Sequence, residues 1–267
     1  MHRRALLTLG LLPGLLFLYL PIILLVLFSF NDARLLTGWA GFSWRWYAAL
    51  WHDRALIEAA LLSLRVAALA ATGATLVGLA AGLALARFAR FPGRAAFTAA
   101  LAAPLVLPDV LIGLSLLLLF VATEEAIGWP HNRGVATIVL AHVTFSLSYV
   151  AVVVQARLAD TDPALEEAAA DLGAPPWLVF LAITLPLAAP ALLSGWLLAF
   201  TLSLDDLVVA SFVSGPGAST LPMVVFSSLH LGATPELDAL ATVMLAICAA
   251  ALAISGRIGV ARRRRRL

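Results

Sequence analysis

The chain of 267 residues contains no lysine, a single cysteine and few charged residues of any kind. Only 12% of its residues are charged and 63% are hydrophobic. An ordinary soluble domain has about 25% charged and about 45–50% apolar residues. Water cannot solvate so apolar a surface, and the composition therefore excludes an ordinary soluble domain and indicates a membrane protein.

The scarce residue types also exclude several kinds of site. Cys248 has no second cysteine with which to form a disulfide, and the five histidines do not have metal-ligand spacing. We therefore expect neither disulfides nor a metal site. A phosphate loop of the form GxxxxGK[ST] needs a lysine to reach the terminal phosphates of ATP. Because all seventeen basic residues are arginine, this chain cannot contain such a loop.

Six apolar runs are each long enough to form a membrane-spanning helix, which needs about 20 residues. They cover about Leu6–Phe28, Ala59–Leu85, Ala95–Val121, Val135–Gln155, Ala188–Val213 and Leu237–Ser255. The sequence therefore predicts an all-α membrane protein with six transmembrane helices, forming a single domain over residues 1–267.

The distribution of arginine predicts the orientation of these spans. An even number of spans places both termini on the same side. With the termini in the cytoplasm, the inner segments hold twelve arginines and the outer segments hold five. Basic residues are enriched in cytoplasmic loops, so we predict that both termini are cytoplasmic. We interpret the run Arg262–Arg266, which directly follows the last span, as a topology anchor rather than a nucleic-acid-binding tail.

The first outer loop is rich in aromatic residues, whose amphipathic rings suit the lipid headgroup layer. We expect this loop to lie on the outer membrane face, in contact with lipid. The aromatic residues are Trp39, Trp44, Trp46, Tyr47 and Trp51.

The inner segment at about 157–187 has its own helix signals. Asp162 can cap a helix that begins next to it, and Gly173 can adopt the left-handed conformation that ends one. Pro176 can open a second short helix, which we expect Pro186 to interrupt. The pattern predicts a helix-turn-helix on the cytoplasmic face.

The same segment resembles the cytoplasmic signature of permease subunits in bacterial ABC importers that use binding proteins. Three residues separate Glu167-Ala168-Ala169 from Gly173, and nine more separate Gly173 from Ile183-Thr184-Leu185-Pro186. The resemblance implies that the segment docks as a coupling helix on an ATPase subunit, which binds the ATP. The residues implied in coupling are Glu167, Ala168, Ala169, Gly173, Ile183, Leu185 and Pro186.

Four further stretches look like the second permease subunit of spermidine and putrescine importers. They are Ser29–Asn31, Leu107–Val110, Leu165–Gly173 and Phe200–Pro216. This resemblance implies a polyamine cargo, two ATPase subunits, a second similar permease and an extracytoplasmic binding protein. Permeases for iron, thiamine or phosphonates share much of this architecture and remain alternatives.

Asp109, Asp205 and Asp206 are among the acids that lie within the apolar runs. An ionised side chain at the bilayer centre costs about 2.5–3.5 kcal/mol, so these acids need a reason to be there. If Arg65 pairs with one of them, a net negative charge remains, which favours a cationic cargo.

On a continuous helix, Asp205 and Asp206 would share one polar sector. We therefore predict a substrate path that includes these acids and Asp109, with Trp196 and Phe200 as aromatic neighbours.

Each acid also has a structural interpretation. Pro104 and Pro108 are expected to break the third helix, which would leave Asp109 at the positive end of the second half. The aspartate pair could instead bond to the partner permease.

Two other classes of protein were considered. His142 and Ser146 lie one helical turn apart, as in an intramembrane hydrolase, but the sequence offers no third orienting group. We therefore assign no catalytic residue to this chain. A secondary transporter or channel is the remaining alternative.

Overall fold

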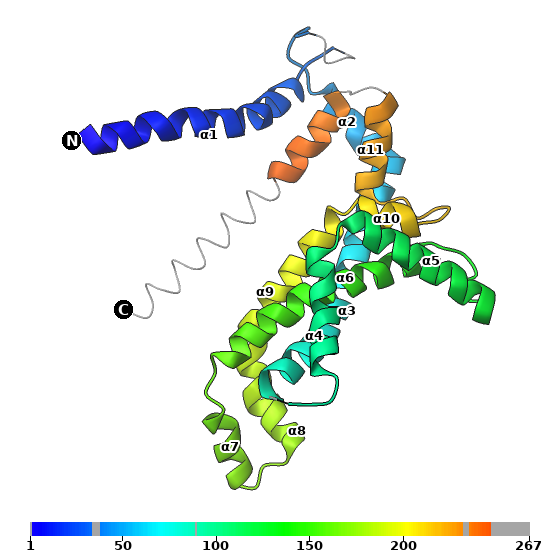
Figure 1. Ribbon diagram of the computed structural model, residues 1–267. Helices are drawn as coiled ribbons and strands as arrows, with labels where there is room; N and C mark the ends of the chain where they lie inside the picture. The colour runs from blue at the N-terminus through cyan, green and yellow to red at the C-terminus, as the bar shows by residue number, and fades with distance from the viewer. Residues whose placement is uncertain (1, 34–37, 89, 232–234, 247–267) are drawn as a thin grey trace. The chain divides into compact units, whose positions relative to one another are not determined.

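The computed structural model describes residues 2–33, 38–88, 90–231 and 235–246 (Figure 1). The chain forms two compact units. One contains Met1–Ile57 and Val225–Leu267, and the other contains Glu58–Val224.

The first unit contains α1 (His2–Phe28), α2 (Arg45–His52), part of α11 (Leu221–Leu231) and a helix at 235–246. Helix α1 covers the first predicted span. The helix at 235–246 covers the start of the sixth, while the rest of that run, with Cys248 and Arg262–Arg266, lies outside the described residues. Helix α11 was not predicted.

Asn31 organises the aromatic loop of the first unit. Its Nδ2 donates to the carbonyl of Gly38 at 2.7 Å, and its Oδ1 accepts from the N–H of Ala40 at 2.8 Å. Its own carbonyl accepts from Trp46 Nε1 at 2.7 Å. These bonds hold the loop folded back on itself, while Trp44 and Trp51 stay exposed.

In the described part of the chain, four helical stretches are long and apolar enough to cross a membrane. They are α3 (Arg54–Arg87), α5 (Asp109–Ile127), α6 (Val135–Ala159) and Pro176–Leu204. Shorter apolar helices include Pro13–Phe28, Leu221–His230 and α4 (Arg94–Val106). The all-α membrane fold is confirmed, but helix lengths alone do not establish the predicted count of six spans.

The third apolar run is divided, as predicted. Helix α4 ends at Val106, and α5 begins at Asp109 after the extended residues Leu107 and Pro108. Proline has no N–H to donate and restricts the residue before it to extended conformations, which accounts for the break. Pro104 does not break the helix, since α4 continues past it.

Two expectations about the fifth run are wrong. First, Pro186 does not interrupt a helix, because α8 (Pro176–Val179), the π-helix η1 (Phe180–Thr184) and α9 (Leu185–Leu204) follow one another without a gap. The N–H of Leu185 bonds to the carbonyl of Phe180, five residues back. This wider turn shifts the hydrogen-bond register just before Pro186, which has no N–H to contribute.

Second, the span does not continue as one helix to Val213. Helix α9 ends at Leu204, and a separate helix, α10 (Val208–Val213), follows after three residues that are not helical. The continuous helix on which Asp205 and Asp206 were predicted to share one polar sector is therefore interrupted.

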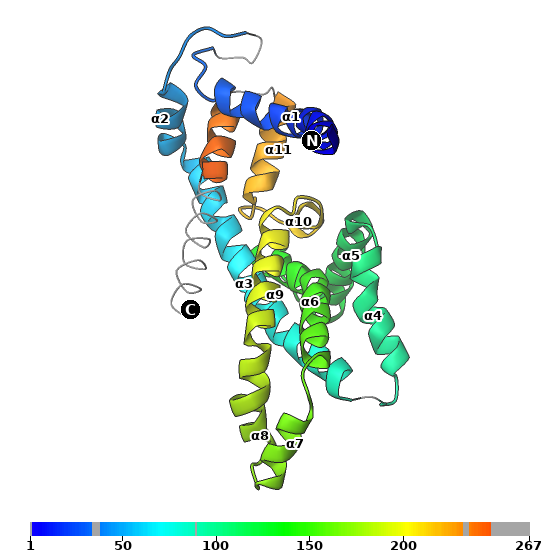
Figure 2. The same ribbon diagram turned by 90° about the vertical axis from the view of Figure 1, so that its left-hand side faces the viewer.

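Helix α6 is the central helix of the second unit and packs against α4, α9 and α10 (Figures 1 and 2). It also lies against α3, where an added Cβ at Gly82 would lie 2.7 Å from the carbonyl oxygen of Ala151. Glycine is needed at this position because the two backbones approach too closely for a side chain, as at many helix contacts in membranes.

Candidate functional site

A cavity of about 320 Å³ in the second unit brings together Asp109, Asp205 and Asp206. Its lining comes from α4, α5, α6 and the junction of α9 with α10. The lining residues are Pro104, Asp109, Phe145, Tyr149, Leu202, Asp205, Asp206, Leu207 and Val208. The predicted grouping of Asp109 with the aspartate pair is thus present in the folded chain.

Asp109 is the first residue of α5 and is exposed. The positive end of a helix dipole favours a carboxylate at this position, so the structural interpretation accounts for its location. Its carboxylate nevertheless forms no hydrogen bond or ion pair among the residues that the structure describes. The same carboxylate therefore keeps its capacity to bind a cation.

Asp205 and Asp206 differ in their surroundings although they are adjacent. The carboxylate of Asp206 accepts from the N–H groups of Val209 at 3.2 Å and Ala210 at 2.7 Å, and so caps α10. Asp205 is exposed, and its carboxylate has no partner within the described ranges. Of the pair, Asp206 is structural and Asp205 is free to act in the cavity.

His142 of α6 supports Asp206 from the other side. Its Nε2 lies 3.2 Å from Asp206 Oδ2, and its Nδ1 lies 2.6 Å from the hydroxyl oxygen of Ser203. The His142 side chain is completely buried. These bonds join α6 to both sides of the break in the fifth run.

The same contacts argue against a hydrolase. His142 is engaged by Ser203 and Asp206 rather than by Ser146, whose buried hydroxyl has no hydrogen-bond partner. Ser203 is itself buried and cannot reach a substrate. Sequence reasoning singled out His142 and missed these partners, because they lie about 60 residues away, one on α9 and the other in the break after it.

Trp196 and Phe200 do not line the cavity. Their rings stack on each other on α9, with centroids 5.2 Å apart, and Trp196 Nε1 donates to Thr72 Oγ1 at 3.2 Å. Both pack beside the buried cluster of α6 and α9. The aromatic residues that do line the cavity are Phe145 and Tyr149.

Arg65 does not neutralise the cavity. It is exposed on α3 and forms no ion pair with Asp109, Asp205 or Asp206.

The segment at about 157–187 forms the predicted helical pair. Asp162 Oδ1 accepts from the N–H of Ala164 at 3.0 Å, where α7 (Ala164–Asp171) begins. Gly173 has φ +85°, its N–H bonds to Ala170, and the N–H of Ala174 bonds to Ala169. This is the Schellman pattern that satisfies the last carbonyls of a helix.

The residues with an implied coupling role divide into two groups. Glu167, Ala168 and Gly173 are exposed on α7 and its turn. Ile183 and Leu185 are half-buried in the continuous helix, and Pro186 is exposed there. Exposed apolar side chains, Leu172 at 90% and Trp177 at 63%, lie beside the turn.

Sequence reasoning missed an ion pair at the base of α7. Arg87, the last residue of α3, pairs with Glu166 at 3.0 Å. Neither residue belongs to the coupling signature, and no spacing rule connects positions so far apart in the chain.

A bundle of apolar helices, an acidic cavity at two helix breaks and an exposed helical pair define a polytopic membrane permease. The chain belongs to the family described as the binding-protein-dependent transport system inner membrane component, whose pattern matches residues 74–267. It is therefore a permease subunit of an ABC importer and not an enzyme. ATPase and binding-protein partners follow from this membership.

Two relatives match most of the chain. The putrescine transport system permease protein PotI of Escherichia coli K12 is 60% identical over 88% of this chain and 84% of its own length. The spermidine/putrescine transport system permease protein PotC of Haemophilus influenzae is 45% identical over 90% of both chains.

Solved structures support the fold. A bacterial ABC transporter involved in the import of alginate has a chain with a TM-score of 0.69 and 15% identity, covering 96% of both chains. A chain of an amino acid ABC transporter gives a TM-score of 0.54 at 21% identity, covering 79% of this chain and 94% of that one.

Proposed function

We propose that this permease subunit translocates a polyamine, putrescine or spermidine, across the bacterial inner membrane. The observation that carries the proposal is the pair of free carboxylates, Asp109 and Asp205, in one cavity. The names of the two relatives support the same cargo class.

The charge of the cavity favours a cation. Its lining contains three acids and no arginine, and the adjacent His142 contacts Asp206 alone among these acids. A protonated amine placed between Asp109 and Asp205 would offset charges that are otherwise costly in an apolar environment. The ring faces of Phe145 and Tyr149 can hold an ammonium group or its methylene chain. An anionic phosphonate would be repelled by the same lining.

The assembly proposed for transport consists of this chain, a second similar permease, two ATPase subunits and an extracytoplasmic binding protein. ATP would bind to the ATPase subunits. Both termini of this chain would be cytoplasmic, which places the α7 pair on the ATPase side. The arginine distribution supports this orientation.

The test compares three single substitutions in the assembled complex. Asp109→Asn and Asp205→Asn each remove a charge without removing a structural hydrogen bond. Each should lower polyamine uptake about tenfold, which corresponds to about 1.4 kcal/mol of lost stabilisation. Asp206→Asn should instead lower the yield of assembled complex, because this carboxylate caps α10 and contacts His142.

Uptake is measured in proteoliposomes at matched amounts of complex, and polyamine binding to the separate binding protein serves as the control. That binding should be unchanged in all variants. Full polyamine uptake by both Asp109→Asn and Asp205→Asn would refute the cavity as the cargo path.

A further inference from the structure

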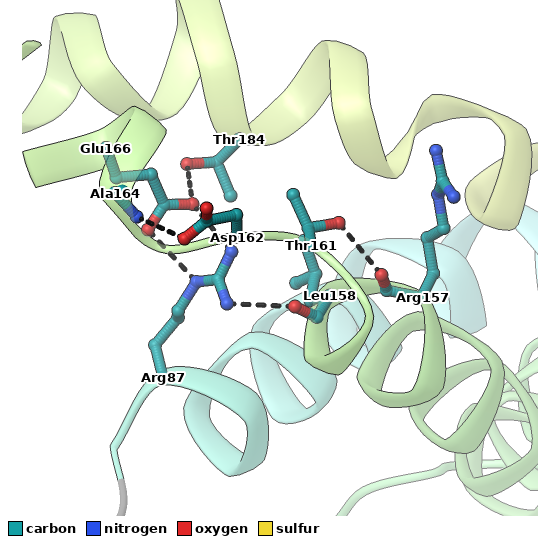
Figure 3. Close-up of polar contacts among 8 residues, drawn as sticks. All are labelled: Arg87, Arg157, Leu158, Thr161, Asp162, Ala164, Glu166 and Thr184. Carbon is teal, nitrogen blue, oxygen red and sulfur yellow. Dashed lines mark hydrogen bonds and ion pairs between the residues drawn. The ribbon is translucent and has the colours of Figure 1, made fainter. Parts of the chain in front are cut away.

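Arg87 holds α7 against the membrane-spanning helices at one point (Figure 3). Its Nε and Nη2 each donate to the carboxylate of Glu166 at 3.0 Å. Its Nη1 donates to the carbonyl of Leu158, near the end of α6, at 2.8 Å. One side chain of α3 thus binds both α6 and α7.

The carboxylate of Glu166 makes one further bond. Thr184 Oγ1 donates to Glu166 Oε1 at 2.8 Å, so the carboxylate lies between Arg87 and Thr184 (Figure 3). Thr184 is buried and is the last residue of the π-helix η1. The continuous helix formed by α8, η1 and α9 is therefore joined to α7 through the carboxylate of Glu166, which also binds Arg87 of α3. We name the three residues Arg87, Glu166 and Thr184 the cytoplasmic joint.

The joint is built to resist displacement. A guanidinium and a carboxylate that bond through two parallel N–H groups have a fixed relative orientation, unlike a single-point ion pair. The Arg87 and Glu166 side chains are only 15% and 19% exposed, so water screens them weakly. By contrast, the exposed pair Arg45–Asp32 in the first unit has a single contact at 3.2 Å.

Adjacent glutamates on α7 face in different directions. Glu166 turns toward the chain's own helices, whereas Glu167 is exposed and has no partner within the described residues. The surface of α7 that bears Glu167 is therefore free for the ATPase, while Glu166 fixes a different side of the helix to this subunit, about 100° away.

We propose that the cytoplasmic joint transmits the movement of ATPase-bound α7 into α3 and α9. Arg87, Glu166 and Thr184 are positioning residues, because they act on the cargo path through the helices that they connect. A displaced α7 pulls α3 through Arg87 and α9 through Thr184 together. The proposal rests on the coupling role of α7 and adds the residues that connect α7 to the bundle.

The first experiment measures coupling in proteoliposomes that contain the whole complex. Glu166→Gln keeps the size of the side chain and removes its charge. Asp160→Asn is the matched control, because Asp160 is an exposed cytoplasmic acid whose carboxylate has no bond in the described structure. The number of polyamine molecules moved per ATP hydrolysed should fall about threefold or more in Glu166→Gln, with hydrolysis retained. The control should match the wild type.

The second experiment measures the rigidity of the joint without using cargo. Spin labels are placed at Phe88, which directly follows α3 next to the joint, and at Ala174 in the turn after α7, with Cys248 replaced by serine. The distance between the labels is recorded without nucleotide and after trapping with vanadate. The wild type should give one narrow distribution in each state, and Glu166→Gln should give broad ones.

A wild-type transport ratio or an unbroadened distance distribution in Glu166→Gln would overturn the proposal. If this variant does not assemble, Thr184→Val, which loses only the bond from η1, is judged by the same two measurements. Failure of the wild type to take up polyamine would refute the proposed cargo, and the distance measurement would still decide the role of the joint.

Discussion

The turn after α7 provides a prediction whose magnitude follows from backbone geometry. Gly173 has φ +85°, and a Cβ built at this position meets no atom within 4 Å. Any cost of a side chain is therefore conformational rather than steric. A non-glycine residue held in the left-handed region costs about 1–2 kcal/mol, and asparagine tolerates this region better than other residues.

Three substitutions separate this cost from other effects. Gly173→Asn should be mild, Gly173→Ala should cost about 1 kcal/mol, and Gly173→Val should cost more because its branched Cβ is especially unfavourable at positive φ. A cost of about 1–2 kcal/mol lowers the population of the native turn relative to an opened turn by a factor of about 5–30.

The opened turn loses the bonds from Gly173 to Ala170 and from Ala174 to Ala169. The membrane spans do not depend on these bonds, so insertion and assembly should be normal. Uptake per ATP hydrolysed should be lowered least by Gly173→Asn, more by Gly173→Ala and most by Gly173→Val. The largest decrease should not exceed the same factor of about 5–30. Equal uptake by all three variants at matched complex levels would refute the claim that this bend requires glycine.

Two further predictions concern helix packing and orientation. Gly82→Ala places a Cβ 2.7 Å from the carbonyl oxygen of Ala151, which cannot move independently of α6, so it should destabilise the complex by about 1–3 kcal/mol in thermal denaturation. Gly14→Ala, where the added Cβ has open space, should be neutral, and equal midpoints for the two variants would contradict the packing argument. In a Cys248→Ser background, a cysteine at exposed Ser219 should react with an impermeant reagent in intact cells, whereas one at Ala174 should react only after permeabilisation. The reverse pattern would overturn the orientation.

Local signals in the sequence predicted the helical pair around Gly173 well. Asp162 and Gly173 act on backbone groups within a few residues, so their effects can be read without the rest of the fold. Pro186 misled the prediction because its effect depends on the preceding turn. The π-helix η1, which accommodates Pro186 by shifting the hydrogen-bond register before it, has no simple sequence signal.

Long-range partners could not be predicted from one sequence. Hydropathy identified Asp205 and Asp206 as unusual, but it could not tell that His142 and the N–H groups of α10 satisfy only Asp206. Nor could it place Trp196 against Thr72, away from the cavity. Each of these outcomes depends on helix packing between segments far apart in the chain.

The two breaks in the apolar runs have a common physical reason. Backbone that is not helical within a membrane must lie inside protein or beside a water-filled cavity, since lipid cannot bond its polar groups. The break before Asp109 and the break at Asp205 and Asp206 both adjoin the same cavity. In other transporters, broken helices at a cargo site present polar groups to the solute. The acids and the helix breaks are therefore parts of one feature, and a substitution that closed either break would be expected to move a carboxylate out of the cavity.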